Sequence, residues 1–148
     1  MLTRKDISPT DGVDLDERMA LEHFFGKSRE EALELLRQDF SYYVEDLTYM
    51  GDKAFFYYLG AVKDYLEEGA FSPSDYVDMA RELLGVFQYR ESLIPNDDIL
   101  WIGEHIATRL EEIVRHDESW ADEPFLISEK KIRNLTKRWR EGTATARP

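Results

Sequence analysis

Hydrophobic residues recur three and four positions apart along most of this chain, which is the spacing of one face of an α-helix. The most regular stripe runs through Ile99, Ile102, Ile106, Leu110 and Ile113. No segment sustains the alternation of apolar and polar residues that marks a half-buried strand. The pattern therefore predicts an all-α fold, a single compact domain of about six helices arranged as an orthogonal bundle or a short array of helical hairpins.

Residues 1–13 are expected to form an irregular leader, because turn-forming residues recur there and little of it is apolar enough to be buried. The first helix then begins at Asp14, which stands three residues before Glu17 in the spacing of a capping box. Gly26 ends this helix, since glycine commonly follows a helix C-terminus. The helical domain is accordingly predicted over 14–141.

The second helix begins at Ser28, which forms a clearer capping box with Glu31. Its apolar stripe is continuous enough for a single helix to reach Leu47. A break near Ser41 is equally compatible with the sequence, because the residues over 41–44 are mediocre helix formers.

The third helix, predicted over 52–68, is the most hydrophobic and is therefore expected to be central. One face carries Phe55, Leu59, Val62 and Leu66. Phe56 and Tyr57 lie outside this face, so the helix is apolar nearly all round. Gly60 lowers its helix propensity, and the close approach of a neighbouring helix would explain a glycine at this position.

The second half of the chain predicts three more helices. Ser72 followed by Pro73 opens the fourth, because serine caps a helix well and proline suits its first position. Pro95 closes this helix, and Asn96 opens the fifth, which runs to His116.

The end of the chain leaves this regular pattern before a last helix. An extended connector is expected over 119–127, held in place by two aromatic residues. Ser128 then caps a helix that reaches about Glu141, and the tail over 142–148 is predicted to be disordered.

The chain has 148 residues and a net charge of −12 at pH 7, and this charge is unevenly distributed. Residues 1–118 carry 12 Lys and Arg against 27 Asp and Glu, whereas residues 119–148 carry 7 against 4. Such an acidic surface disfavours nucleic acid and anionic membranes as partners and favours a basic protein. The basic last helix can either dock on the acidic body or bind in trans.

Several classes of chemistry are excluded by composition. The chain has no cysteine, which excludes disulfides, thiolate zinc sites and a cysteine nucleophile. Gly-rich phosphate loops and the common hydrolase and zinc-protease motifs are also absent, so no cofactor is expected. Because no run of about 18 apolar residues and no signal-like N-terminus occur, we expect a cytoplasmic protein.

The most suggestive polar residues lie in the aromatic-rich segment 40–66. They are Tyr42, Tyr43, Glu45 and Asp46. Neighbouring carboxylates can serve in acid–base chemistry or bind a metal when burial shifts their pKa. Adjacent helical positions point about 100° apart, however, so the two carboxylates are not expected to converge. A structural or contact role at a helix end is therefore favoured over catalysis.

Further candidates lie on the fifth helix. Trp101 lies outside the isoleucine stripe and either anchors a partner or covers the loop near Pro95. His105, Glu112 and His116 share one helical face, and the last two, at i and i+4, could chelate a metal. A solvated polar flank gives the same pattern more often, so a metal site is not the favoured interpretation.

Three short motifs carry a resemblance to a known family: HFxGKS over 23–28, YYxEDL over 42–47 and MGxxAFxYYL over 50–59. With these motifs the chain resembles a family of small, uncharacterised, all-helical bacterial proteins. The resemblance implies a bacterial cytosolic protein, and it implies no mechanism and no catalytic residues.

The sequence as a whole favours a non-enzymatic, acidic protein-binding module, of the kind to which immunity and inhibitor proteins belong, that docks on a basic partner surface. The predicted contact residues are Tyr42, Tyr43, Glu45, Asp46, Trp101 and Glu112. The alternative is a small metal-dependent enzyme or ligand-binding helical protein with a site near 42–46 and 105–116. The oligomeric state is not readable from the sequence.

Overall fold

The structure is a computed structural model that describes residues 1–90, 95–120 and 123–146. Every regular element in these residues is a helix, which confirms the all-α class. The chain divides into two compact units, Met1–Gly69 and Ala70–Pro148. The prediction of a single domain stays a prediction. None of the described helices is both long and apolar enough to cross a membrane.

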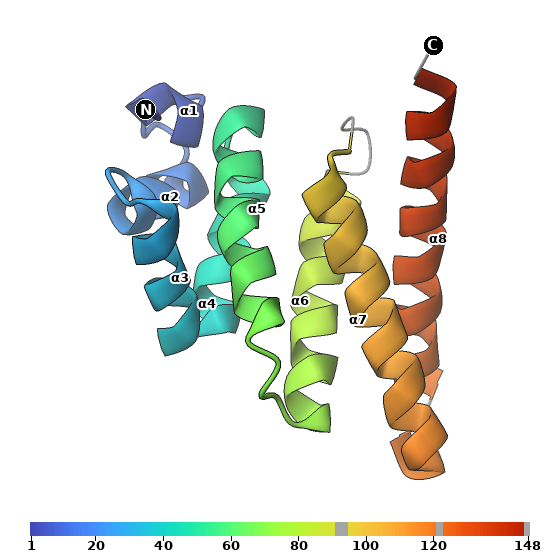
Figure 1. Ribbon diagram of the computed structural model, residues 1–148. Coiled ribbons are helices and arrows are strands. Elements are labelled where there is room, and N and C mark those ends of the chain that lie inside the picture. The colour runs from blue at the N-terminus through green and yellow to red at the C-terminus, as the bar shows by residue number, and fades with distance from the viewer. Residues whose placement is uncertain (91–94, 121–122, 147–148) are drawn as a thin grey trace. The chain divides into compact units, whose positions relative to one another are not determined.

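The first unit holds five α-helices and one short 3₁₀ helix. In chain order these are α1 (Arg4–Ile7), α2 (Leu15–Phe24), α3 (Arg29–Gln38), α4 (Phe40–Val44), η1 (Glu45–Tyr49) and α5 (Asp52–Glu67). Helix α3 packs along α5, and α1 and η1 also contact α5 (Figure 1). The described residues of the whole chain form eight α-helices where the sequence predicts about six, the additional ones being the short α1 and α4.

Helix α5 provides much of the first unit's core, as its hydrophobic pattern predicts. Its most deeply buried side chains, none more than 1% exposed, are Ala54, Phe55, Tyr58, Leu59, Ala61, Val62 and Leu66. Its ends also agree with the prediction to within one residue. A helix with apolar residues on this much of its circumference is stable only when neighbours cover it.

Gly60 of α5 does allow a close approach, but a side chain makes it. A Cβ at position 60 would lie 2.9 Å from the guanidinium carbon of Arg29, at the start of α3. That guanidinium binds both carboxylate oxygens of Asp64, at 2.7 Å each. The glycine therefore makes room for an ion pair that joins α3 to α5.

Residues 1–13 are not an irregular leader. Thr3 and Asp6 form a reciprocal capping box that starts α1, and Ile7 is completely buried. The backbone oxygen of Asp6 accepts a hydrogen bond from the Gly51 N–H at 3.0 Å. A one-turn helix has no hydrophobic period for a sequence to reveal, and such a helix is stable only through tertiary contacts.

Asp14 caps α2 as predicted, but Glu17 does not complete the capping box. The Asp14 side chain accepts a hydrogen bond from the Glu17 N–H at 3.1 Å. The buried Glu17 carboxylate instead accepts hydrogen bonds from the hydroxyls of Ser8 and Thr10, at 2.8 and 3.0 Å, and from the Thr10 N–H at 2.8 Å. Glu17 therefore holds the loop between α1 and α2.

The helix break that the sequence allows near Ser41 lies at Asp39. This residue ends α3 and caps α4, because its side chain accepts a hydrogen bond from the Tyr42 N–H at 3.2 Å. A single helix reaching Leu47 is therefore excluded, and Leu47 belongs to η1.

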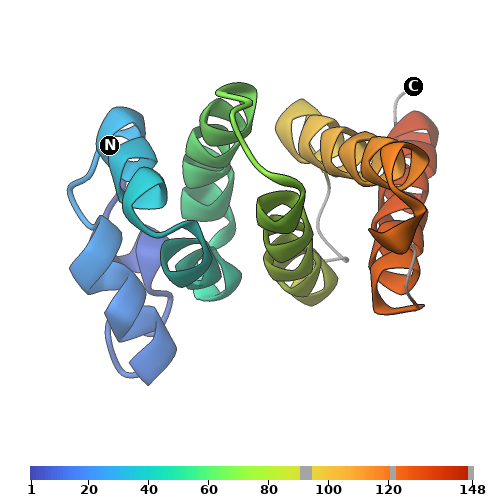
Figure 2. The ribbon, with the colours of Figure 1, turned by 90° about the horizontal axis from the view of Figure 1, so that it is seen from below.

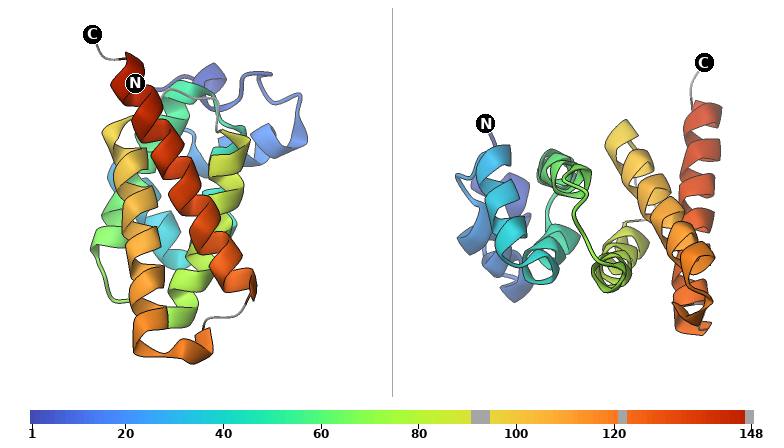
Figure 3. Two further views of the ribbon diagram at one scale, coloured as in Figure 1. Left: turned by 90° about the vertical axis from the view of Figure 1, so that its right-hand side faces the viewer. Right: turned by 60° about the horizontal axis from the view of Figure 1, so that its bottom comes forward.

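The described part of the second unit consists of three long helices and one 3₁₀ turn. They are α6 (Pro73–Tyr89), α7 (Asp97–His116), η2 (Glu118–Trp120) and α8 (Glu123–Ala146). Helix α7 packs on α8, and α6 contacts both (Figures 2 and 3). The predicted caps at Ser72 and Asn96 are confirmed, since each side chain accepts a hydrogen bond from a first-turn N–H.

The connector predicted over 119–127 is not extended. Trp120 belongs to η2 and α8 begins at Glu123, so Ser128 lies inside a helix that it was expected to cap. Residues 121–122 lie outside the described residues. Proline at the second position of α8 is compatible with a helix start, which the sequence interpretation overlooked.

The last helix also extends further than predicted. Helix α8 continues to Ala146, so the tail expected to be disordered over 142–148 is helical as far as Ala146. The buried side chains of Ile132, Leu135 and Trp139 fix α8 in the second unit, and a helix that is fixed in this way propagates at little cost.

Candidate functional site

The candidate site in the first unit forms where α4 runs into η1, and it includes a residue from α2. Tyr42 and Tyr43 belong to α4, and Glu45 and Asp46 to η1. His23, in the last turn of α2, places its Nδ1 atom 2.5 Å from a carboxylate oxygen of Asp46. The side chains of His23 and Asp46 are 17% and 12% exposed, so the pair is largely shielded from solvent.

Two tyrosine rings contact the His23 imidazole. Its ring centre lies 5.3 Å from that of Tyr42 and 5.1 Å from that of Tyr43. Tyr43 also packs edge-on against the buried Phe24, whereas Tyr42 remains 50% exposed. Tyr43 is therefore packed between His23 and Phe24, whereas half of the Tyr42 surface remains accessible to solvent.

Asp46 lies in an environment that disfavours its charge. Burial raises the pKa of Asp46 above its usual value, and the hydrogen bond and positive charge of His23 act in the opposite direction without cancelling this effect. The nearby carboxylates of Glu45 and Asp16 raise the pKa further. Two further carboxylates therefore lie close enough to Asp46 to disfavour its charge.

The His23–Asp46 pair has some, but not all, of the groups that acid–base catalysis needs. A carboxylate at Nδ1 orients an imidazole and leaves Nε2 for proton exchange. General acid–base catalysis also needs a nucleophile or substrate group near Nε2. Within the described residues, no hydroxyl is hydrogen-bonded to His23.

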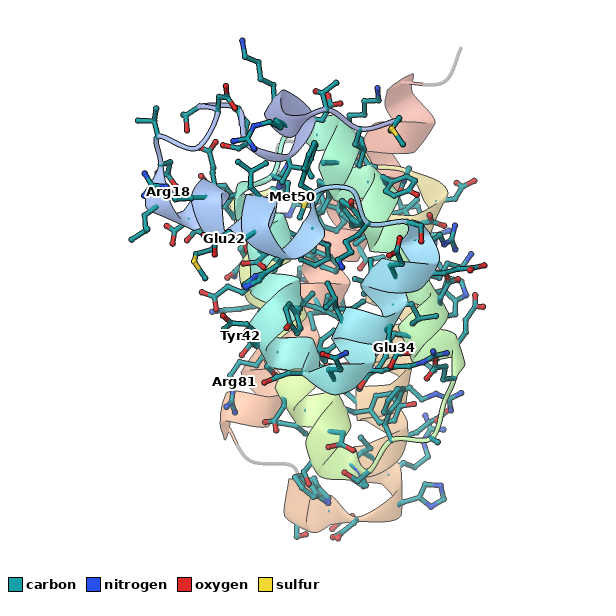
Figure 4. All side chains as sticks on the ribbon, turned by 90° about the vertical axis from the view of Figure 1, so that its left-hand side faces the viewer. Arg18, Glu22, Glu34, Tyr42, Met50 and Arg81 are labelled. Atoms are coloured by element: carbon teal, nitrogen blue, oxygen red, sulfur yellow. The ribbon has the colours of Figure 1, made fainter. Side chains whose placement is uncertain are left out.

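The surface that carries Tyr42 is acidic. Figure 4 shows Tyr42 of α4 and Glu22 of α2 on the same side of the first unit, and both are exposed. Glu45 is exposed as well. We refer to the exposed Tyr42, Glu22 and Glu45, together with the largely shielded Asp46, as the tyrosine–acid surface.

His23 is the functional candidate that the sequence did not connect with the cluster. It is 23 positions from Asp46, and neither residue lies in a spacing pattern that reports the contact. The only hint in the sequence is that both occur in the motifs of the family resemblance.

The candidates on α7 belong to the second unit, and they do not converge. His105 stacks on Trp101, with ring centres 4.6 Å apart, while Glu112 forms an ion pair with Arg109 at 2.7 Å. His116 is exposed at the end of the helix. Among the residues that the structure describes, no group of three or more His, Asp or Glu side chains is placed to hold a metal ion.

The basic last helix is partly neutralised within its own unit. Arg133 of α8 binds Glu129 and, at 2.6 Å, Glu111 of α7, and Arg140 pairs with Glu104. These contacts support docking of α8 on acidic residues of α7. Lys130, Lys131 and Lys137 are exposed and form no ion pair with a described residue.

Comparison of the chain with protein-family models, curated proteins and solved structures finds no match. The resemblance to a small bacterial helical family therefore stays a prediction. Any function has to be argued from the site itself.

Proposed function

We propose that the protein is a non-enzymatic, acidic protein-binding module that docks on a basic partner through the tyrosine–acid surface. The observation that carries this proposal is the half-exposed ring of Tyr42, which contacts His23 of the His23–Asp46 pair. Immunity and inhibitor proteins are the functional class that this description fits best. We place the protein in the cytoplasm as part of the same proposal.

Tyr42 has the properties of an interface anchor. Tyrosine is enriched among the residues that contribute most to binding, because its ring buries a large area at a small entropic cost. The contacts with His23 and Tyr43 hold the ring of Tyr42 in place before a partner arrives. A preorganised anchor loses less conformational entropy on binding.

Charge favours a basic partner for this surface. The first unit, 1–69, carries 16 Asp and Glu against 8 Lys and Arg, and the second unit carries 15 against 11. The tyrosine–acid surface thus belongs to the more acidic unit. Complementary charge accelerates association and discriminates against acidic partners.

A site-specific photocrosslink tests the location of the interface. A benzophenone amino acid at position 42 is expected to capture one basic protein in the native cell, and mass spectrometry identifies it. The matched control is position 89, because Tyr89 is 63% exposed but belongs to the second unit. The same adducts at both positions, or an acidic protein at position 42, would contradict the proposal.

The captured partner then allows a kinetic test. We expect the association rate constant to fall about tenfold between roughly 10 and 150 mM salt, because steering between opposite charges is screened. Tyr42→Ala is expected to act mainly on dissociation, since anchors set the lifetime of a complex. A salt-independent association rate would show that charge does not guide this encounter.

A small metal-dependent enzyme is the second candidate, and the pairing of His23 with Asp46 is the observation that favours it, because imidazole and carboxylate groups both bind metal ions. Metal analysis of the purified protein, with thermal unfolding measured with and without a chelator, separates the two functions. We expect no change in the melting temperature on chelation. A stoichiometric metal that raises the melting temperature would favour the enzyme, because a bound ion stabilises the folded state.

A further inference from the structure

A second feature of the first unit is a cavity beside the turn between α2 and α3. Its volume is about 850 Å³, which is within the range of small-molecule sites. Residues from the N-terminal segment, from the α2–α3 turn and from the first half of α5 line it. None of the residues of the tyrosine–acid surface lines this cavity.

Much of the cavity wall is aromatic. Phe56, Tyr57 and Tyr58 are consecutive residues of α5, and all three line it together with Leu2. The sequence places Phe56 and Tyr57 outside the buried face of this helix. Their position in the cavity wall gives a reason for aromatic residues on that side, because a flat ring stacks well on such walls.

Tyr58 makes this wall rigid. Its hydroxyl lies 2.8 Å from the backbone oxygen of Phe24 and 2.9 Å from that of Lys27, so it bridges both sides of the α2–α3 turn. Burial raises the pKa of Tyr58 to about 12, which keeps the hydroxyl protonated as a donor. The turn that carries Lys27 is therefore fixed against α5.

The polar groups of the cavity are mostly donors suited to an anion. Lys27 lines the cavity and forms no ion pair with a described residue, and Lys53 has only a long contact of 3.9 Å with Asp6. The Tyr57 hydroxyl accepts a hydrogen bond from the Arg29 N–H at 3.1 Å and donates its own proton to no described residue. A hydroxyl that accepts one hydrogen bond becomes a better donor for another.

One carboxylate in the wall, that of Glu31, opposes an anion, and it stays ionised. Glu31 accepts a hydrogen bond from the Ser28 N–H at 3.0 Å within the capping box of α3. This backbone hydrogen bond, more than any other interaction, lowers the pKa of Glu31, and Lys27 contributes to the same effect. The two lysines therefore outnumber the single carboxylate in the cavity wall.

We propose that this cavity binds a small amphipathic anion, a monocarboxylate with an aromatic body. The aromatic wall would cover the apolar body, and Lys27, Lys53 and the Tyr57 hydroxyl would bind the carboxylate. This binding activity goes beyond the proposed protein partner, and it does not depend on that partner. The cavity is expected to prefer an anion, whereas the net negative charge of the whole chain would by itself favour a cation.

Three probes with the same ring system test the charge preference by calorimetric titration of the full chain. They are 2-naphthoate, 2-naphthalenemethanol and 2-naphthylmethylammonium. We expect 2-naphthoate to bind with a dissociation constant below about 1 mM and about tenfold more tightly than the alcohol, with the cation weakest. The net charge of −12 by itself would give the opposite order.

Substitutions then locate the site. Lys27→Met and Lys53→Met remove the charge and keep most of the length of each side chain. Each is expected to weaken the binding of 2-naphthoate about fivefold or more without changing the binding of the alcohol. Tyr57→Phe keeps the ring and removes the hydroxyl, with a similar expected loss. Lys63→Met is the matched control, because Lys63 is on the same helix but does not line the cavity.

Each outcome decides the proposal. A preference for the anion that is lost in the cavity variants and kept in Lys63→Met supports it. Equal binding of anion and alcohol, a preference for the cation, or no saturable binding at all overturns it. Unchanged 2-naphthoate binding in both lysine variants that retain the wild-type melting temperature overturns it as well, because the anion must then bind elsewhere.

Discussion

The fold buries Asp46 in a way that disfavours its ionised carboxylate. Its pKa is raised because the folded chain buries the carboxylate and places Glu45 and Asp16 near it. A group whose charge is disfavoured in the folded state contributes nothing to stability by being ionised. Residues of this kind are common at functional sites, where the local environment serves binding or chemistry and the rest of the fold supplies stability.

Replacement of Asp46 by asparagine tests this effect of burial through the pH dependence of the free energy of unfolding. The folded-state pKa lies above the usual 3.8, so the folded protein holds this proton more tightly than the unfolded chain does. The contribution of Asp46 to stability is therefore present at low pH and is lost as pH rises through the raised pKa. We expect Asp46→Asn to become progressively more stabilising, relative to the original chain, as pH rises from below the usual pKa of 3.8 through the raised pKa of Asp46.

The measurement is the free energy of unfolding in urea for both proteins at several pH values. Glu45→Gln is the control for loss of one negative charge, because Glu45 is an exposed neighbour. A stability difference for Asp46→Asn that shrinks with rising pH would show that His23 lowers the pKa of Asp46 more than burial raises it.

At the scale of the helices, Gly51 and Gly103 each allow two helices to approach closely. A Cβ at Gly51 would lie 2.6 Å from the backbone oxygen of Asp6, so only glycine lets α1 meet the start of α5. A Cβ at Gly103 of α7 would collide with Oγ1 of Thr136 on α8. That hydroxyl donates a hydrogen bond to the Ile132 oxygen at 2.9 Å, so it cannot turn away without losing the bond.

We therefore expect Gly103→Ala to lower the free energy of unfolding by about 1–3 kcal/mol, although alanine favours a helix. Gly85→Ala is the matched control, because Gly85 is also inside a long helix and a Cβ at position 85 would meet no neighbouring group within 4 Å. It should stabilise the protein by about 0.5–1 kcal/mol.

Thermal and urea unfolding of these variants check the prediction. Thr136→Ala in the Gly103→Ala background should recover part of the loss, which a double-mutant cycle reveals as a coupling between the two sites. If Gly103→Ala and Gly85→Ala stabilise the protein equally, α7 and α8 do not approach each other closely at Gly103.

At the scale of the whole molecule, the chain consists of two compact units with their own helix contacts. In the first unit α3 packs along α5, and in the second α7 packs on α8. Both candidate sites, the tyrosine–acid surface and the cavity, lie in the first unit. The sequence predicts one domain, and whether the units fold together is a separate question.

A fragment that spans residues 1–71 answers that question. We expect it to be helical by circular dichroism and to unfold cooperatively, with lower stability than the full chain because a domain of this size buries a smaller share of its surface. A fragment without a cooperative transition would support the single-domain prediction. Binding of 2-naphthoate to a folded fragment would also place the anion site in the first unit.

Much of the local structure was predictable, because it depends on interactions over three or four residues. The caps at Ser28, Ser72 and Asn96 and the buried face of α5 follow from spacing and from hydrogen bonds that each helix makes with its own first turn. The errors fall where local patterns are weak, at the one-turn helix α1 and at both ends of α8.

The sequence by itself determined the all-α class, most helix boundaries, the central place of α5 in its unit and the net negative charge. Only the tertiary structure brought His23 to Asp46, set Tyr42 and Tyr43 around them and arranged Phe56 and Tyr57 in the wall of a cavity. The physical reason is distance along the chain. Contacts between residues 20 or more positions apart depend on how helices pack, and no local period of three or four residues records them.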